Sequence, residues 1–156
     1  VNNLKLLAQA DLAQDTANPS MPLMTANVML ADAIPNQRII MDHLPSFDPA
    51  PDGQAAYEAV VKEMAARPNI FVKLTEVYHP RLDTKQVVGD YIPLRDRLEY
   101  LFGMFGEDRV MFGTDQMAWP KLMAYSISIV QNADYLTPQQ KRDILYNNAA
   151  RFLRLK

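Results

Sequence analysis

Short apolar runs alternate with amphipathic segments along this chain, and the alternation predicts four β-strands that are each followed by an α-helix. The apolar runs are too short for helices, and prolines or polar turns bound them. In the helical segments apolar residues recur with helical period, as Tyr57, Val61 and Met64 do. The predicted strands are 11–16, 38–44, 69–77 and a run from Arg109 to the break at Gly113. The predicted helices are 22–34, 52–66, 93–105 and 121–132, with another after Thr137 and a helix-like segment opening the chain.

The last helix begins with a capping box. Thr137 is the expected N-cap, Pro138 suits the first helical position, and Gln140 can reach back to the cap. The residues expected to face inward from this helix are Ile144, Leu145, Phe152 and Leu153.

The order of elements predicts the fold class. Successive strands begin roughly 30 to 40 residues apart, as βα units of a parallel sheet or barrel do. No repeat, linker or low-complexity tract divides the chain, so residues 1–156 are expected to form a single domain. In parallel α/β folds the chemistry lies at the carboxyl ends of the strands, where side chains leave the packed core. Candidate functional residues are therefore sought there.

Composition narrows the function classes. Hydrophobic residues make up 49% of the 156 residues and charged residues 22%, which is typical of a globular domain with a core. The net charge of −2 carries no sign of binding to nucleic acid or an anionic membrane. The absence of cysteine favours a cytoplasmic protein, and no run approaches the roughly 20 apolar residues of a membrane span. The sequence leaves open whether an export signal lies upstream of Val1. The glycines match no phosphate-binding loop, and no GxSxG elbow is present.

Polar and ionisable residues gather where the predicted strands end. These residues are Gln14 and Asp15, Asp42 and His43, Glu76, Tyr78, His79 and Arg81, and Thr114 and Asp115. An imidazole and a carboxylate that converge on one pocket can bind a divalent metal, or can activate water directly as base and orienting partner. The pattern therefore predicts a site that binds a metal or activates water, with both histidines, His43 and His79, among its candidates.

Each of these residues also has a structural interpretation. His43 and His79 can be hydrogen-bonded loop residues, and Asp115 can cap the segment that follows it. Lys73 lies mid-strand among apolar neighbours, where it can snorkel or pair with an acid, and a structural pairing is favoured.

A surface salt bridge is the structural alternative for Glu76 and Arg81.

Five segments taken in order resemble a known family. NLKLLAQADLAQD, RIIMDHLPSF, ARPNIFVKLTEVYHPR, FGEDRVMFGTDQMAWP and NNAARFLRL resemble the C-terminal half of the amidohydrolase-related (amidohydrolase 2) family of metal-dependent hydrolases. The branch most similar to them contains 2-pyrone-4,6-dicarboxylate lactonase. The resemblance spans nearly the whole chain and implies strands five to eight of a (β/α)8 TIM barrel. We therefore expect an α/β fold that forms a partial barrel.

The resemblance also implies roles for individual residues. His43 matches the histidine that ends strand six, and Asp115 matches the aspartate that ends strand eight. In such enzymes this aspartate is a general base for water or a metal ligand, and the histidine orients or coordinates beside it. Arg81, His79 and Tyr78 lie where the lactonase-like branch contacts the substrate carboxylate. Hydrolysis of a lactone or related carboxylated small molecule is the leading expectation, with amide hydrolysis and decarboxylation as relatives.

Two departures from the family bear on the cofactor. The histidine that usually ends strand five is replaced here by a segment with Gln14, Asp15 and Asn18. The strand-one His-x-His pair has no counterpart in these residues. Two alternatives therefore stay open. In the first, a divalent metal, zinc or manganese, is held in part by His43 and Asp115. In the second, the mechanism is metal-independent.

The length of the chain leads to further expectations. A TIM barrel needs about 250 residues, so strands one to four are expected upstream of Val1, and the 156 residues by themselves are expected to be inactive. Exposed sheet edges would then be covered by that missing half or by a second copy in a homo-oligomer. The competing hypothesis is a noncatalytic four-stranded α/β domain that binds a small ligand or a partner.

Overall fold

The structure is a computed structural model that describes residues 2–17, 20–43, 53–75, 94–115 and 123–155. Its elements are α1 (Asn2–Gln9), β1 (Gln14–Thr16), α2 (Met21–Ala33), β2 (Ile39–Met41), α3 (Gln54–Ala65), β3 (Ile70–Leu74), α4 (Leu94–Phe105), β4 (Val110–Phe112), α5 (Met123–Asn132), α6 (Pro138–Arg142) and α7 (Asn148–Leu153). A 3₁₀ turn, Glu107–Arg109, precedes β4, and a π-helical turn, Asp143–Asn147, joins α6 to α7. None of the described helices has the length and apolar character needed to cross a membrane.

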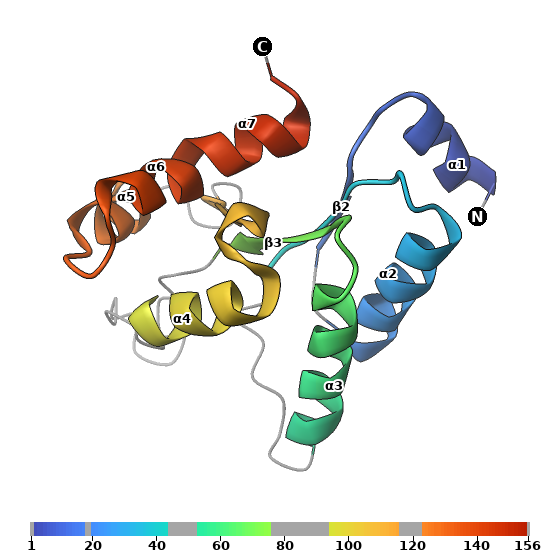
Figure 1. The fold of residues 1–156 in the computed structure, drawn as a ribbon, viewed down its shortest axis with the longest axis horizontal. Helices are drawn as coiled ribbons and strands as arrows, with labels where there is room; N and C mark the ends of the chain where they lie inside the picture. Colours follow the sequence, from blue (N-terminus) through green and yellow to red (C-terminus); the bar gives the residue numbers. More distant parts are fainter. Residues whose placement is uncertain (1, 18–19, 44–52, 76–93, 116–122, 156) are drawn as a thin grey trace.

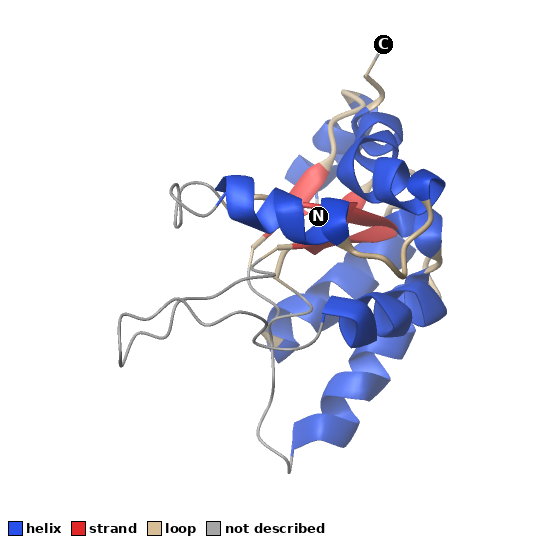
Figure 2. Ribbon diagram, turned by 90° about the vertical axis from the view of Figure 1, so that its left-hand side faces the viewer, coloured by secondary structure: helices blue, strands red, loops and turns tan. Residues whose placement is uncertain are grey.

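The four strands form one parallel sheet in the order β1-β2-β3-β4. Register places Thr16 beside Met41, Met41 beside Val72, and Val72 beside Val110. Each strand pairs with the next along the chain, and the helices that connect them pack against the sheet (Figures 1 and 2). The predicted alternation of four strands with helices in an α/β fold is confirmed.

The strands bury both of their faces, as strands of parallel sheets do. Alternate residues point to opposite sides, and Ile39, Met41 and Val72 belong to the larger apolar cluster between the sheet and the helices. The helices contribute buried residues to this cluster from their inward faces, namely Met24, Leu30, Tyr57, Val61, Met64, Leu98, Leu101, Phe105 and Val130. This packing holds the strands in place, because three-residue ladders contribute few hydrogen bonds of their own.

A smaller cluster covers the opposite face of the sheet, which we call the inner face. Ile40 and Met111 meet Phe152 of α7 there. The ring of Phe152 also packs edge-on against Phe71, with 4.8 Å between centroids. The end of α7 thereby closes the inner face toward the amino ends of the strands, where Arg154 forms an ion pair with Asp11.

The predicted strands are longer than the observed ones, most clearly at β1. Residues 11–13 do not extend β1, because the amide of Leu12 still bonds to the carbonyl of Leu7 and Asp11 takes a positive φ of 56°. Leu153 was predicted to face inward; it lines a cavity on the inner face, and 53% of its surface is exposed.

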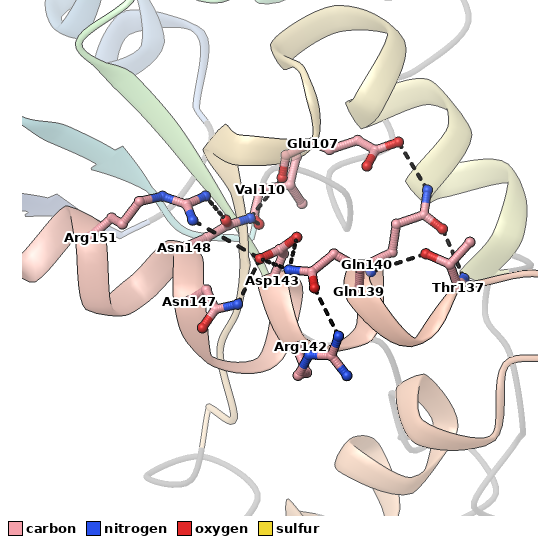
Figure 3. Close-up of polar contacts among 10 residues, drawn as sticks. All are labelled: Glu107, Val110, Thr137, Gln139, Gln140, Arg142, Asp143, Asn147, Asn148 and Arg151. Carbon is pink, nitrogen blue, oxygen red and sulfur yellow. Dashed lines mark hydrogen bonds and ion pairs between the residues drawn. The ribbon is translucent and has the colours of Figure 1, made fainter.

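The C-terminal helices are anchored to β4 through a network of polar contacts (Figure 3). The predicted capping box is confirmed, since Thr137 accepts a hydrogen bond from the amide of Gln140 at 3.2 Å and donates its own amide hydrogen to Gln140 Oε1 at 2.9 Å. The fully buried Asn148 donates its side-chain amide to the carbonyl of Val110 at 2.6 Å and to that of Glu107 at 2.7 Å. Asn148 therefore fixes α7 to the start of β4.

We expect Asn148→Ala to lower the free energy of unfolding by about 2–4 kcal/mol, because two carbonyls lose a buried donor and a cavity remains. Asn147→Ala is the matched control. Asn147 is the sequence neighbour of Asn148, and its replacement removes one hydrogen bond, which its side chain donates to Asp143. We therefore expect the free energy of unfolding to change by at most about 1 kcal/mol. Urea unfolding of the purified protein would measure both. Equal effects of the two variants would contradict the anchoring role of Asn148.

Candidate functional site

A pocket of about 450 Å³ opens at the carboxyl ends of β2, β3 and β4. The residues that line it are Asp42, His43, Lys73, Thr75, Phe112, Gly113, Thr114 and Asp115. Most of them directly follow a strand, so the parallel register brings residues far apart in sequence to one edge of the sheet. The structure thus places His43 and Asp115 in one pocket, while their catalytic roles stay predictions.

Both candidate residues leave their strands through the left-handed region of backbone space. The φ angle is 59° at His43 and 46° at Asp115. Histidine and aspartate are among the residue types that tolerate this region, although it costs of order 1–3 kcal/mol. Such conformations are concentrated at functional sites, because surrounding contacts must maintain them.

The side chain of Thr75 maintains one of these conformations. Its hydroxyl oxygen accepts a hydrogen bond from the backbone amide of His43 at 3.0 Å. The same oxygen lies 2.8 Å from Nδ1 of the His43 ring. One threonine therefore contacts both the backbone and the imidazole of the candidate histidine. Thr75 was not among the predicted site residues, because the predicted strand 69–77 extended past it, whereas β3 ends directly before it.

Lys73 carries the positive charge of the pocket and lies between two carboxylates. Its ammonium forms ion pairs with Asp15 of β1 and with Asp42, the latter at 2.9 Å. This confirms the structural pairing that the sequence favoured. Lys73 also lines a second, 280 Å³ cavity on the inner face, together with Asp15, Ile40 and Met111. The ion pairs thus separate the apolar part of the inner face from the polar pocket above it.

Burial and ion pairing act in opposite directions on these groups. Burial raises the pKa of Asp42, and the hydrogen bond from Lys73 offsets part of that rise. Burial by itself lowers the pKa of Lys73, but hydrogen bonds to Asp15 and Asp42 outweigh it, so the pKa of Lys73 is raised. Lys73 is therefore a charged counter-ion at neutral pH and not a nucleophile.

The described residues do not complete a metal site by themselves. A catalytic zinc takes three protein ligands and a water, and the described part of the chain holds no cluster of three or more histidine and acidic side chains suited to a metal ion. Asp15 and Asp42 are already occupied by Lys73. His43 and Asp115 could supply two ligands, so any further ligand would have to come from outside the described residues.

Several predicted residues cannot be compared with the site. Glu76, Tyr78, His79, Arg81 and Asn18 lie outside the described residues. On β1, Asp15 is the residue that reaches the inner face.

Gln14 and Thr16 lie on the opposite face of the same strand, where Thr16 hydrogen-bonds to Asn27 of α2. Gln14, which lies near the position of the histidine that usually ends strand five in the family, is therefore not among the residues that line the described pocket.

A protein family and several solved structures match nearly the whole chain. The sequence profile of a family described as Amidohydrolase matches residues 5–155. No functionally curated protein sequence gives a significant match.

Solved structures are similar over nearly the whole chain at low sequence identity. An amidohydrolase from Burkholderia multivorans, solved with bound zinc, superposes with a TM-score of 0.70 at 20% identity over 99% of this chain and 57% of its own. Amidohydrolase 2 from Bifidobacterium longum subsp. infantis gives a TM-score of 0.66 at 20% identity, covering 98% and 54%. A putative 2-pyrone-4,6-dicarboxylic acid hydrolase from Pseudomonas putida gives 0.58 at 19% identity, covering 97% and 55%.

The chain thus spans about half the length of the solved structures it matches. Those structures are TIM barrels, and the four parallel βα units of this chain match part of such a barrel. The predicted fold, a partial (β/α)8 barrel, is confirmed.

We expect Lys73→Met to lower the free energy of unfolding by about 1–3 kcal/mol at pH 7, between the effects of exposed and fully buried ion pairs. The loss should shrink as the pH falls, because the raised pKa of Asp42 rises further without the ammonium and protonation then removes the unpaired charge. In the unsubstituted protein, stability from Lys73 is present below its ordinary pKa of 10.5 and is lost as the pH rises through its raised value.

Urea unfolding at pH 7 and at about pH 5 would measure this effect. The matched control is the double variant Asp42→Asn/Lys73→Met, which removes both charges of the closer pair and should recover part of the lost stability. Two results would show that the lost stability does not come from the ion pair with Asp42. One is a loss of unfolding free energy that is the same at both pH values, and the other is a double variant no more stable than Lys73→Met.

Proposed function

The chain belongs to the amidohydrolase family, as its sequence predicted, and we propose that the protein containing it hydrolyses a lactone or a related carboxylated small molecule with activated water. The observation that carries the proposal is that His43 and Asp115, at the ends of β2 and β4, line one pocket. The left-handed backbone at both residues supports it, since such strain is retained where function requires a fixed geometry.

In the proposed reaction Asp115 is the general base. Its carboxylate takes a proton from a water molecule while the water oxygen attacks the carbonyl carbon of the lactone. The tetrahedral intermediate then collapses, the ring C–O bond breaks, and the leaving oxygen takes the proton back from Asp115. His43 lines the same pocket and orients the reacting groups through its imidazole.

The charge of the pocket bears on the substrate. Among its described lining residues, Asp42 and Asp115 face a single cation, Lys73, which is neutralised by its two acidic partners. A carboxylated substrate therefore needs another cation. Arg81 is our candidate, because its guanidinium can bind a carboxylate through two hydrogen bonds. We propose that Tyr78 and His79 contact the substrate beside it.

The metal-dependent and metal-independent forms of this proposal differ in the role of His43 and Asp115. With zinc or manganese and further ligands from outside the described residues, the two side chains would be metal ligands. Without a metal they act directly on water and substrate, as described above.

We expect Asp115→Asn to lower kcat by about 10²–10⁴-fold, because an amide cannot accept the proton of the attacking water. The assay would use the full natural protein and a panel of carboxylated lactones, with an amide and an aromatic carboxylate included to detect amide hydrolysis or decarboxylation. Asp108→Asn is the matched control, since Asp108 is an exposed aspartate before the opposite end of β4. Its kcat should be unchanged.

Two outcomes would contradict parts of the proposal. Full activity of Asp115→Asn would remove Asp115 from the reaction, and no turnover of any substrate by the unsubstituted protein would remove the hydrolase function. Repeating the assay after chelation separates the two forms: activity that survives favours the metal-independent form, and activity restored by zinc or manganese favours the metal centre.

A further inference from the structure

Thr75 lies at the centre of the contacts that hold His43 in place. It directly follows β3, and its side chain is almost fully buried, with 3% of its surface exposed. Its hydroxyl bonds to the His43 amide at 3.0 Å and to the ring nitrogen Nδ1 at 2.8 Å. Two bonds to one residue restrict both the backbone turn and the rotation of the ring. Whichever group donates the proton in the second bond, Nδ1 is engaged by the Thr75 hydroxyl.

The neighbouring strand leaves room for this threonine only because it carries glycine. A Cβ atom at Gly113 would lie 2.3 Å from Cγ2 of Thr75, far inside van der Waals contact, and 3.3 Å from the Cδ atom of Lys73. The Gly113 backbone cannot easily retreat, because its amide bonds to the carbonyl of Leu74 at 3.1 Å. Any side chain at position 113 would therefore displace Thr75, whereas the flexible Lys73 could yield by a few tenths of an ångström.

These contacts form a continuous path between the two candidate residues. Asp115 follows Gly113 by two positions on the same segment, and Gly113 meets Thr75, which holds His43. The path joins the ends of β2, β3 and β4, so a change at one strand end reaches the imidazole at another.

We propose that Thr75 is a positioning residue for His43, and that Gly113 is required because it leaves the space that Thr75 occupies. The part of this proposal that concerns activity rests on the proposed function. The part that concerns the imidazole does not, because the hydrogen bond can be observed without any substrate.

The test separates the hydroxyl of Thr75 from its shape. Thr75→Val keeps the branched shape and removes the hydroxyl, whereas Thr75→Ser keeps the hydroxyl and removes Cγ2. In the full natural protein, the ¹⁵N signals of the His43 imidazole would be recorded at one fixed pH. We expect Thr75→Val to shift the Nδ1 signal and to lower kcat/KM on the order of 10–100-fold, as loss of a supporting hydrogen bond does. Thr75→Ser should keep the original signals and stay within about threefold in kcat/KM.

A second pair of variants tests the role of Gly113. Gly113→Ala retains the hydroxyl but forces Thr75 aside, so it should shift the His43 signals in the same way. The double variant Gly113→Ala/Thr75→Ser removes the methyl group that clashes, and it should recover the original signals. This pair also decides the question if Thr75→Val fails to fold.

Unchanged His43 signals in Thr75→Val, or in Gly113→Ala if Thr75→Val does not fold, would overturn the proposal. A shift in Thr75→Ser as large as in Thr75→Val would also overturn it, because shape and not the hydroxyl would then matter. Shifted signals with unchanged turnover would uphold the positioning of His43 and remove His43 from the proposed reaction. Failure of the positioning and failure of the function are thereby distinguished.

Discussion

The parallel register between neighbouring strands is the constraint on which the pocket depends. Because Met41 pairs with Val72 and Val72 with Val110, β2, β3 and β4 end at the same edge of the sheet. The strands are short, so their hydrogen bonds contribute little stability of their own, and burial of both faces holds the register. The helices cover one face, and Phe152 from the end of the chain covers part of the other. Packing far from the pocket therefore determines which side chains meet in it.

The inner face changes from apolar to charged along the strands. Ile40, Met111 and Phe152 contribute apolar side chains to its lower part. Lys73 then pairs with carboxylates from two other strands, since one ammonium in a partly buried layer is stable when it has acidic partners. Above this layer the candidate pocket carries groups that can hydrogen-bond, accept protons or bind a cation.

Membership of the amidohydrolase family and the geometry of the pocket support each other at different levels. The family match covers nearly the whole chain, and the similar structures share the fold at about 20% identity while extending over about twice its length. The chemistry proposed here rests on the pocket residues and not on the fold, because one barrel supports many reactions through changes at its strand ends. The positive φ angles at His43 and Asp115 occur at the strand ends where parallel α/β folds place their chemistry.

The sequence by itself determined the local features of this protein. The pattern of apolar residues predicted the four strands and their helices, and the Thr137 capping box is a contact between residues three apart. Strand-end position put His43 and Asp115 among the candidates, and the family resemblance selected them. Tertiary structure decided which residues meet. The threonine that bonds to His43 lies 32 positions away in the sequence, and the acids that pair with Lys73 come from β1 and the end of β2. Gly113 is needed because the methyl group of Thr75, at the end of β3, occupies the space that a Cβ atom would take. Periodicity reports which way a side chain faces, whereas contacts between strands depend on register and packing of the whole sheet.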